Sequence, residues 1–135
     1  MDKKIGRIEK ISFPDLKIES IETKIDTGAY GIALHANGIK VIDDKLHFWI
    51  NEKSNEFIFD KFRTVVVKNS FGRVQKRYAV YTKIVIGGST YKFFISLTNR
   101  KKMKYPVLIG RRFLKKFNYI VDVRATNVND RDKKM

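Results

Sequence analysis

The chain of 135 residues contains no cysteine, and this absence removes three kinds of chemistry. Disulfide frameworks, thiolate zinc sites and cysteine nucleophiles are all excluded. The chain also has no apolar run that approaches the length of a membrane span. Its first residues, Met1–Ile5, carry no apolar signal region. We therefore expect a soluble cytoplasmic protein that does not bind membranes.

Acidic residues are scarce, because 14 Asp and Glu stand against 29 Lys and Arg and leave a net charge of +15. A charge excess of this size indicates partners rather than fold. Nucleic acid, anionic lipid headgroups and acidic peptides all carry the complementary charge. The basic residues are spread along the chain and cluster only at 99–104 and 130–134. The alternative interpretation is a lysine-rich solvated surface with no charged partner.

Histidine is rare as well, with only His35 and His47 in the chain and no His-Glu-x-x-His motif. A zinc peptidase needs three protein ligands and one open position. Each histidine is therefore better explained as a structural residue than as a ligand. The chain also lacks a Gly-rich phosphate loop. We expect no metal and no cofactor.

The residues that are present predict a folded, strand-rich domain. Hydrophobic residues make up 43% of the chain and aromatic residues 13%, which is enough for one core. Short β-rich segments alternate with turn signals, and one short helix is expected at 111–117. The expected strands are 5–11, 17–25, 39–42, 46–50, 56–59, 63–68, 77–86, 89–98 and 119–123.

This pattern favours an all-β fold, a closed or nearly closed barrel with one short helix near the C-terminus. Segments 63–68 and 77–86 read as a long hairpin with a glycine-containing tip. We expect one domain at 1–123 and a polar, flexible tail at 124–135.

The triplet Asp26-Thr27-Gly28 ends an alternating segment and predicts a carboxylate loop. Hydrolysis by an activated water needs two carboxylates that share one proton. The chain offers one such loop, so the chemistry requires two copies. Gly28 permits a tight turn, and the Thr27 hydroxyl can join the loop to its neighbour across the dimer axis. The apolar segment 107–109 is expected beneath the loop, and Gly110 allows a close approach; alone, the triplet also fits an ordinary Asx turn.

Several motifs together resemble a family of bacterial and archaeal retropepsin-like aspartic peptidases once labelled ATP-dependent zinc proteases. The resemblance implies the acid-protease barrel and a homodimer. Members of that family often accompany a glutamate ligase that adds glutamates to a ribosomal protein. A role in trimming such acidic, glutamylated tails, with the ligase as a possible partner, is therefore implied. The motifs are Ile25–Ala29, Ala33–Ala36, Ser70–Gly72, Arg77, Asn99–Arg100, Tyr105–Leu114 and Val121–Val123.

The resemblance also assigns roles to residues. Asp26 matches the catalytic acid, and Thr27 and Gly28 match the loop that supports it. Ala29 would contact substrate beside this loop, and His35 would bond the loop or a substrate acid.

A second group of matched residues lies farther along the chain. Ser70 and Gly72 match the tip of a flap over the cleft. Arg77 and Arg111 match basic positions that can hold substrate carboxylates. The alternatives are a solvated arginine at 77 and a structural ion pair at 111. One departure concerns 30–32, where Tyr-Gly-Ile replaces the small polar residues common in the family.

The functional hypothesis is a homodimeric aspartic endopeptidase that acts on acidic peptide. One alternative is a basic β-barrel module that binds nucleic acid or acidic peptide without catalysis. In that case aromatic rings among the cations would stack on bases. A second alternative is a catalytically silent domain that recognises an acidic tail. The rings concerned are those of Tyr78, Tyr81, Tyr91 and Phe94.

Overall fold

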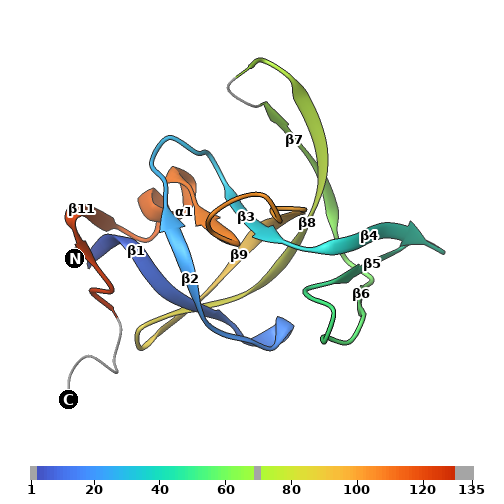
Figure 1. Cartoon of the computed structure of the whole chain (residues 1–135), viewed down its shortest axis with the longest axis horizontal. Helices are drawn as coiled ribbons and strands as arrows, with labels where there is room; N and C mark the ends of the chain where they lie inside the picture. The colour runs from blue at the N-terminus through green and yellow to red at the C-terminus, as the bar shows by residue number, and fades with distance from the viewer. Residues whose placement is uncertain (1–2, 69–70, 130–135) are drawn as a thin grey trace.

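The computed structural model describes residues 3–68 and 71–129 and shows a fold built almost entirely of strands (Figure 1). The all-β class expected from the alternating segments is confirmed, and residues 3–68 and 71–129 contain one short α-helix, as expected. No helix in the described part of the chain has the length and apolar composition needed to cross a membrane.

The elements follow one another closely along the chain. The helix is α1 (Arg111–Lys116), and a 3₁₀ turn, η1 (Pro14–Leu16), follows the first strand. The strands are β1 (Lys3–Phe13), β2 (Ile18–Ile25), β3 (Ile32–His35), β4 (Asn37–Ile42), β5 (Lys45–Trp49), β6 (Phe57–Phe59), β7 (Arg63–Lys68), β8 (Val74–Ile86), β9 (Ser89–Thr98), β10 (Val107–Ile109) and β11 (Tyr119–Thr126).

The strands form one large sheet and one small sheet. The order in the large sheet is β11-β1-β2-β10-β3-β9-β8-β7. A further pairing of β1 with β8, at Ser12 and Val85, closes this sheet into a ring. The small sheet has the order β4-β5-β6 and extends from one side of the ring (Figure 1).

The short strand β10 separates two strands that are neighbours in sequence. It runs parallel to β2, with Ile109 opposite Ile25, and antiparallel to β3, with Ile109 opposite Ile32. Consequently β2 and β3 are not paired with each other but are both bonded to β10. The loop that connects them, residues 26–31, therefore lies at the C-terminal end of β10.

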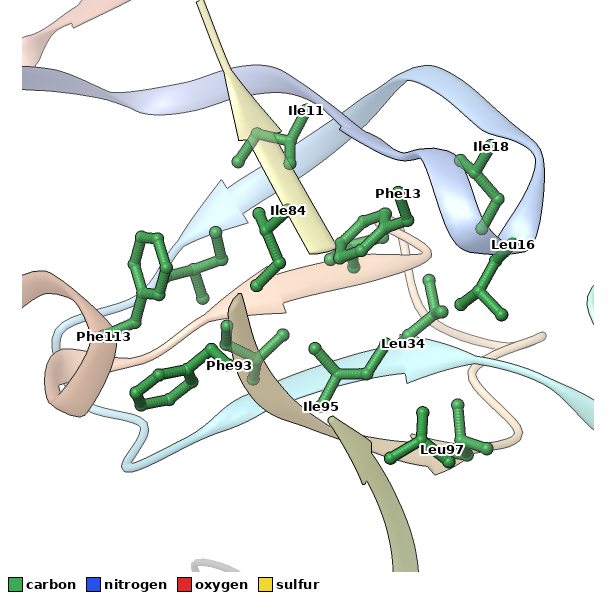
Figure 2. Packing of buried hydrophobic residues seen from close by; sticks show 14 of the residues in the cluster. Ile11, Phe13, Leu16, Ile18, Leu34, Ile84, Phe93, Ile95, Leu97 and Phe113 are labelled. Carbon is green, nitrogen blue, oxygen red and sulfur yellow. The ribbon is translucent and has the colours of Figure 1, made fainter. Parts of the chain in front are cut away.

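The core fills the interior of the ring, and β9 shows why the sequence folds this way. Its apolar residues Tyr91, Phe93, Ile95 and Leu97 occur at every second position and are buried. Phe113 of α1 packs edge-on against the rings of Tyr91 and Phe93. Figure 2 shows Phe93 and Phe113 among the aliphatic core residues. Helix α1 is thus held against the sheet by one aromatic cluster.

Several strands differ from the sequence-based expectation, such as β1, which spans Lys3–Phe13 instead of 5–11, and β8, which begins at Val74 instead of residue 77. Strand β3 was not predicted, and β11 continues to Thr126 instead of ending at Val123. Its pairing with β1 reaches Thr126, opposite Ile8, and the residues after β11 are held by Glu9, which is 0% exposed. Its carboxylate accepts backbone hydrogen bonds from Gly6 at 2.7 Å, Val128 at 3.0 Å and Asn129 at 3.1 Å. These bonds attach residues beyond β11 to the first strand.

Candidate active site

Asp26 comes directly after β2, at the start of the loop that leads to β3. Its backbone N–H donates to the carbonyl of Ile109 at 2.8 Å, which ties the loop to the end of β10. Its Oδ1 accepts the N–H of Gly28 at 3.0 Å, and its carbonyl accepts the N–H of Ala29 at 3.1 Å. The side chain is partly exposed. The loop thus presents a carboxylate on fixed backbone, within the Asx turn that the triplet also suggests.

Three backbone hydrogen bonds fasten the remainder of the loop to the segment after β10. Gly110 donates to Gly31 at 2.9 Å, Arg111 to Ala29 at 2.9 Å and Arg112 to Tyr30 at 3.1 Å. A Cβ atom at Gly110 would lie 2.5 Å from the Gly31 carbonyl oxygen and 2.6 Å from that of Ala29. Only glycine fits this contact, which is the close approach that the sequence predicted for this position.

The other residues of the predicted loop lie beside the carboxylate. Thr27 and Gly28 are exposed, and Ala29 is partly buried. The Arg111 guanidinium donates from Nη1 to the Gly28 carbonyl at 3.2 Å. The Arg111 side chain therefore holds the backbone of the carboxylate loop at Gly28. A contact of Thr27 across a dimer axis stays a prediction.

A buried arginine that the sequence did not single out as a site residue lies in the electrostatic range of Asp26. Arg100, 8% exposed, donates from Nε to the carbonyl of Tyr105 at 3.0 Å. Burial lowers the pKa of Arg100, and the Asp26 carboxylate opposes this by stabilising the charged guanidinium. The carboxylate loop therefore has a fixed cation nearby.

Arg77 and His35 belong to the same neighbourhood. The pKa of Arg77 is lowered by burial and by the charge of Arg100, and its Nε donates to Gln75 at 3.0 Å. His35, at the end of β3, accepts the backbone N–H of Arg100 on Nδ1 at 2.8 Å. Burial and the Arg100 charge lower the pKa of His35. His35 thus joins β3 to the segment after β9, and its Nδ1 is already used by that bond.

The predicted flap corresponds to the β7–β8 hairpin, which stands away from the ring (Figure 1). Gly72 is exposed at its tip with a φ of +80°, in the left-handed region that favours glycine. Ser70 lies outside the described residues. The position of the flap residues relative to a bound peptide stays a prediction.

Among residues 3–68 and 71–129, no three His, Asp or Glu side chains are arranged to hold a metal ion. His47 lies in the small sheet, with Nδ1 3.4 Å from Glu56 Oε1.

The aromatic rings proposed for base stacking do not form one surface. Tyr81 and Phe94 pack against each other with tilted rings and centroids 5.0 Å apart, and Tyr81 is exposed. Tyr78 packs against Phe62, and Tyr91 is buried in the core. Two of the four rings are therefore engaged in the interior.

Most of the chain matches one protein family. Residues 4–132 match the RimB-like family, described as "Retropepsin-like aspartic endopeptidase RimB". The matched region includes the Asp26 loop, β10, α1 and the buried Arg100.

Curated relatives and one solved structure extend this likeness. Proteins named "Probable alpha-L-glutamate ligase" from Shewanella halifaxensis and Shewanella pealeana are 30% and 31% identical over 117 residues. These matches cover 79% of this chain but 26% of the relatives, so the chain spans about a quarter of their length. Lpg0085 of Legionella pneumophila, a crystal structure of unknown function, has a TM-score of 0.75 and 30% identity, covering 96% of this chain and all of that one.

Proposed function

The chain belongs to the RimB-like family of retropepsin-like aspartic endopeptidases, and from this membership we propose that two copies form an aspartic peptidase for acidic, glutamate-rich tails. The observation that carries the proposal is the Asp26 loop. Backbone hydrogen bonds to Ile109 and from Gly110, Arg111 and Arg112 fix this loop, while the carboxylate stays partly exposed. Each subunit supplies one carboxylate, so the catalytic pair is complete only in the homodimer.

In the proposed reaction the two Asp26 carboxyl groups share one proton, because like charges held close together cannot both ionise. The ionised carboxylate accepts a proton from water, whose oxygen forms a bond to the peptide carbonyl carbon. The protonated carboxyl group donates its proton to the carbonyl oxygen. When the C–N bond breaks, the departing amine takes up a proton from the pair. No oxidant or cofactor enters this balance.

Charge and relatives support an acidic substrate. The net charge of +15 attracts polyanions. The charge of Asp26 acts on the Arg100 guanidinium, and the charge of Arg100 acts in turn on Arg77. The longer relatives that contain a region like this chain are named for glutamate ligation. A peptidase encoded beside or within such proteins would act on the glutamate tails that ligation makes.

The test is the variant Asp26→Asn, assayed by mass spectrometry on a protein carrying a glutamate tail. Removal of the acid–base pair is expected to lower the cleavage rate by roughly 10³-fold, with an unchanged circular dichroism spectrum. Asp43→Asn is the matched control, because Asp43 is an exposed turn residue with a φ of +51° that asparagine adopts readily.

Two outcomes would reject the proposal. Full activity in Asp26→Asn would remove Asp26 from the mechanism. If the unaltered chain binds RNA tightly and leaves every glutamate peptide intact, the chain is a nucleic acid binding module.

A further inference from the structure

A cationic hollow lies on the surface next to the carboxylate loop. Tyr30, in that loop, is 61% exposed. The Arg111 and Arg112 guanidinium carbons lie 5.3 Å and 5.2 Å from the centroid of its ring. With Lys115 and Lys116 these residues line a hollow of about 600 Å³. We refer to these five residues as the Tyr30 hollow.

The charges of the Tyr30 hollow are not neutralised within the subunit. In the described part of the chain, none of its four basic side chains forms an ion pair with a carboxylate. Arg111 and Lys115 are four residues apart on α1, as are Arg112 and Lys116. Like charges at this spacing on a helix repel each other. The arrangement is therefore unfavourable for the isolated subunit and favourable once an anion is bound.

The Tyr30 hollow is continuous with the catalytic loop. Arg111 donates to the carbonyl of Gly28, two residues after Asp26, and Arg112 donates its backbone N–H to Tyr30. A peptide whose scissile bond lies at Asp26 would therefore pass close to these cations on leaving the site.

We propose that the Tyr30 hollow is a second anchor for the substrate and binds tail carboxylates that lie beyond the scissile bond. This inference rests on the proposed function, and it adds a requirement for tail length. A short acidic peptide reaches only the Asp26 loop, whereas a longer one also reaches Arg112, Lys115 and Lys116. Long tails therefore have the lower KM, and kcat does not depend on the anchor.

The chemistry of the Tyr30 hollow favours carboxylates over nucleic acid. A base needs an open aromatic face on which to stack, and both guanidinium groups lie over the ring of Tyr30. Carboxylates need only donors and positive charge, which the guanidinium groups supply in a bidentate geometry and the lysines as point charges.

The experiment measures oligoglutamate binding in the catalytically inactive Asp26→Asn protein by fluorescence anisotropy. The test variant adds Arg112→Gln, Lys115→Gln and Lys116→Gln, and leaves Arg111 in place because it supports the loop. The control adds Lys40→Gln, Lys53→Gln and Lys61→Gln, which removes the same charge from exposed positions elsewhere. Long oligoglutamates are expected to bind the test variant at least about tenfold more weakly than the control, a loss of about 1.4 kcal/mol.

Short oligoglutamates should bind both proteins equally, and in the active background the test variant should show a raised KM with unchanged kcat on long tails. Equal binding of long oligoglutamates to the test and control proteins would overturn the inference. It would also be overturned if the test variant lost affinity for a U-rich RNA and kept its affinity for long oligoglutamates. Because binding is measured without turnover, the comparison still decides the inference if the unaltered chain cleaves no peptide. That failure would count against the proposed function alone.

Discussion

The imidazole of His35 illustrates how a single side chain can tie stability to pH. Its Nδ1 accepts the backbone N–H of Arg100 at 2.8 Å, a bond that only an unprotonated Nδ1 can make. Burial, followed by the positive charge of Arg100, lowers the pKa of His35 below its usual 6.5 in the folded chain. Below about pH 6.5, His35 therefore binds a proton more readily in the unfolded chain than in the folded chain.

The stability contributed by neutral His35 is thus present above pH 6.5 and is lost as the pH falls from 6.5 towards the lower folded pKa. Asparagine at this position offers an uncharged oxygen to the same N–H. The variant His35→Asn is expected to lose less stability than the unaltered chain between about pH 7 and about pH 5. Urea unfolding midpoints measured across this range check the prediction. Parallel pH dependences in the two proteins would contradict it.

For single residues, the sequence was a good guide where a residue type has a chemical role or is required by the shape of the backbone. The triplet at 26–28 and the glycine at 110 predicted a fixed carboxylate and a close backbone approach, and both are observed. Arg100 belongs to one of the motifs that carry the resemblance, but it was not assigned a role in the site, because the basic run 99–104 does not reveal that one of its arginines is buried. Its burial depends on β3 and on Tyr105, and neither contact leaves a local signal.

Among the elements, the contact between the end of β10 and the loop after β2 leaves no room for an added side-chain atom at Gly110. The variant Gly110→Ala places a methyl group within 2.7 Å of backbone atoms of residues 29–31. Because backbone cannot yield as a flexible side chain does, we expect a destabilisation of about 3 kcal/mol or more and a lower melting temperature. Gly31→Ala is the control, since no atom lies within 4 Å of its added Cβ. Equal melting temperatures for the two variants would show that the loop is not held as described.

The elements differ in how well the sequence predicts them. Strand β9 alternates apolar and polar residues over its length, so its period is evident. Strand β3 is four residues long and almost wholly apolar, which does not distinguish a strand from other buried segments. It is a strand because β10 and β9 flank it on both sides. The end of β11 likewise depends on a distant partner, because Thr126 pairs with Ile8 of β1.

For the whole molecule, the net charge of +15 opposes the assembly that the proposed chemistry requires. Two such subunits repel each other, and salt shortens the range of the repulsion from about 10 Å at 0.1 M to about 3 Å at 1 M. Sedimentation velocity without substrate is therefore expected to show more dimer as the salt concentration rises. Activity per subunit should rise with protein concentration at fixed salt. Full activity of a salt-independent monomer would contradict the paired-carboxylate mechanism.

Fold class and family were accessible from the sequence, because motifs spread from the first strands to β11 recur together. The partner surface was not, because dimerisation depends on which exposed apolar side chains two copies bring together. The chain shows several such side chains in different elements, including Val66 in β7, Ile58 in β6 and Val123 in β11. Their positions do not single out one face.

The insertion of β10 between β2 and β3 sets an order of events during synthesis. The Asp26 loop is synthesised more than 80 residues before the groups that hold it, from Ile109 to Arg112. A nascent chain that has not yet reached Ile109 therefore carries the Asp26 carboxylate without the backbone groups that hold its loop. The loop can take its folded form only once residues 109–112 have been synthesised.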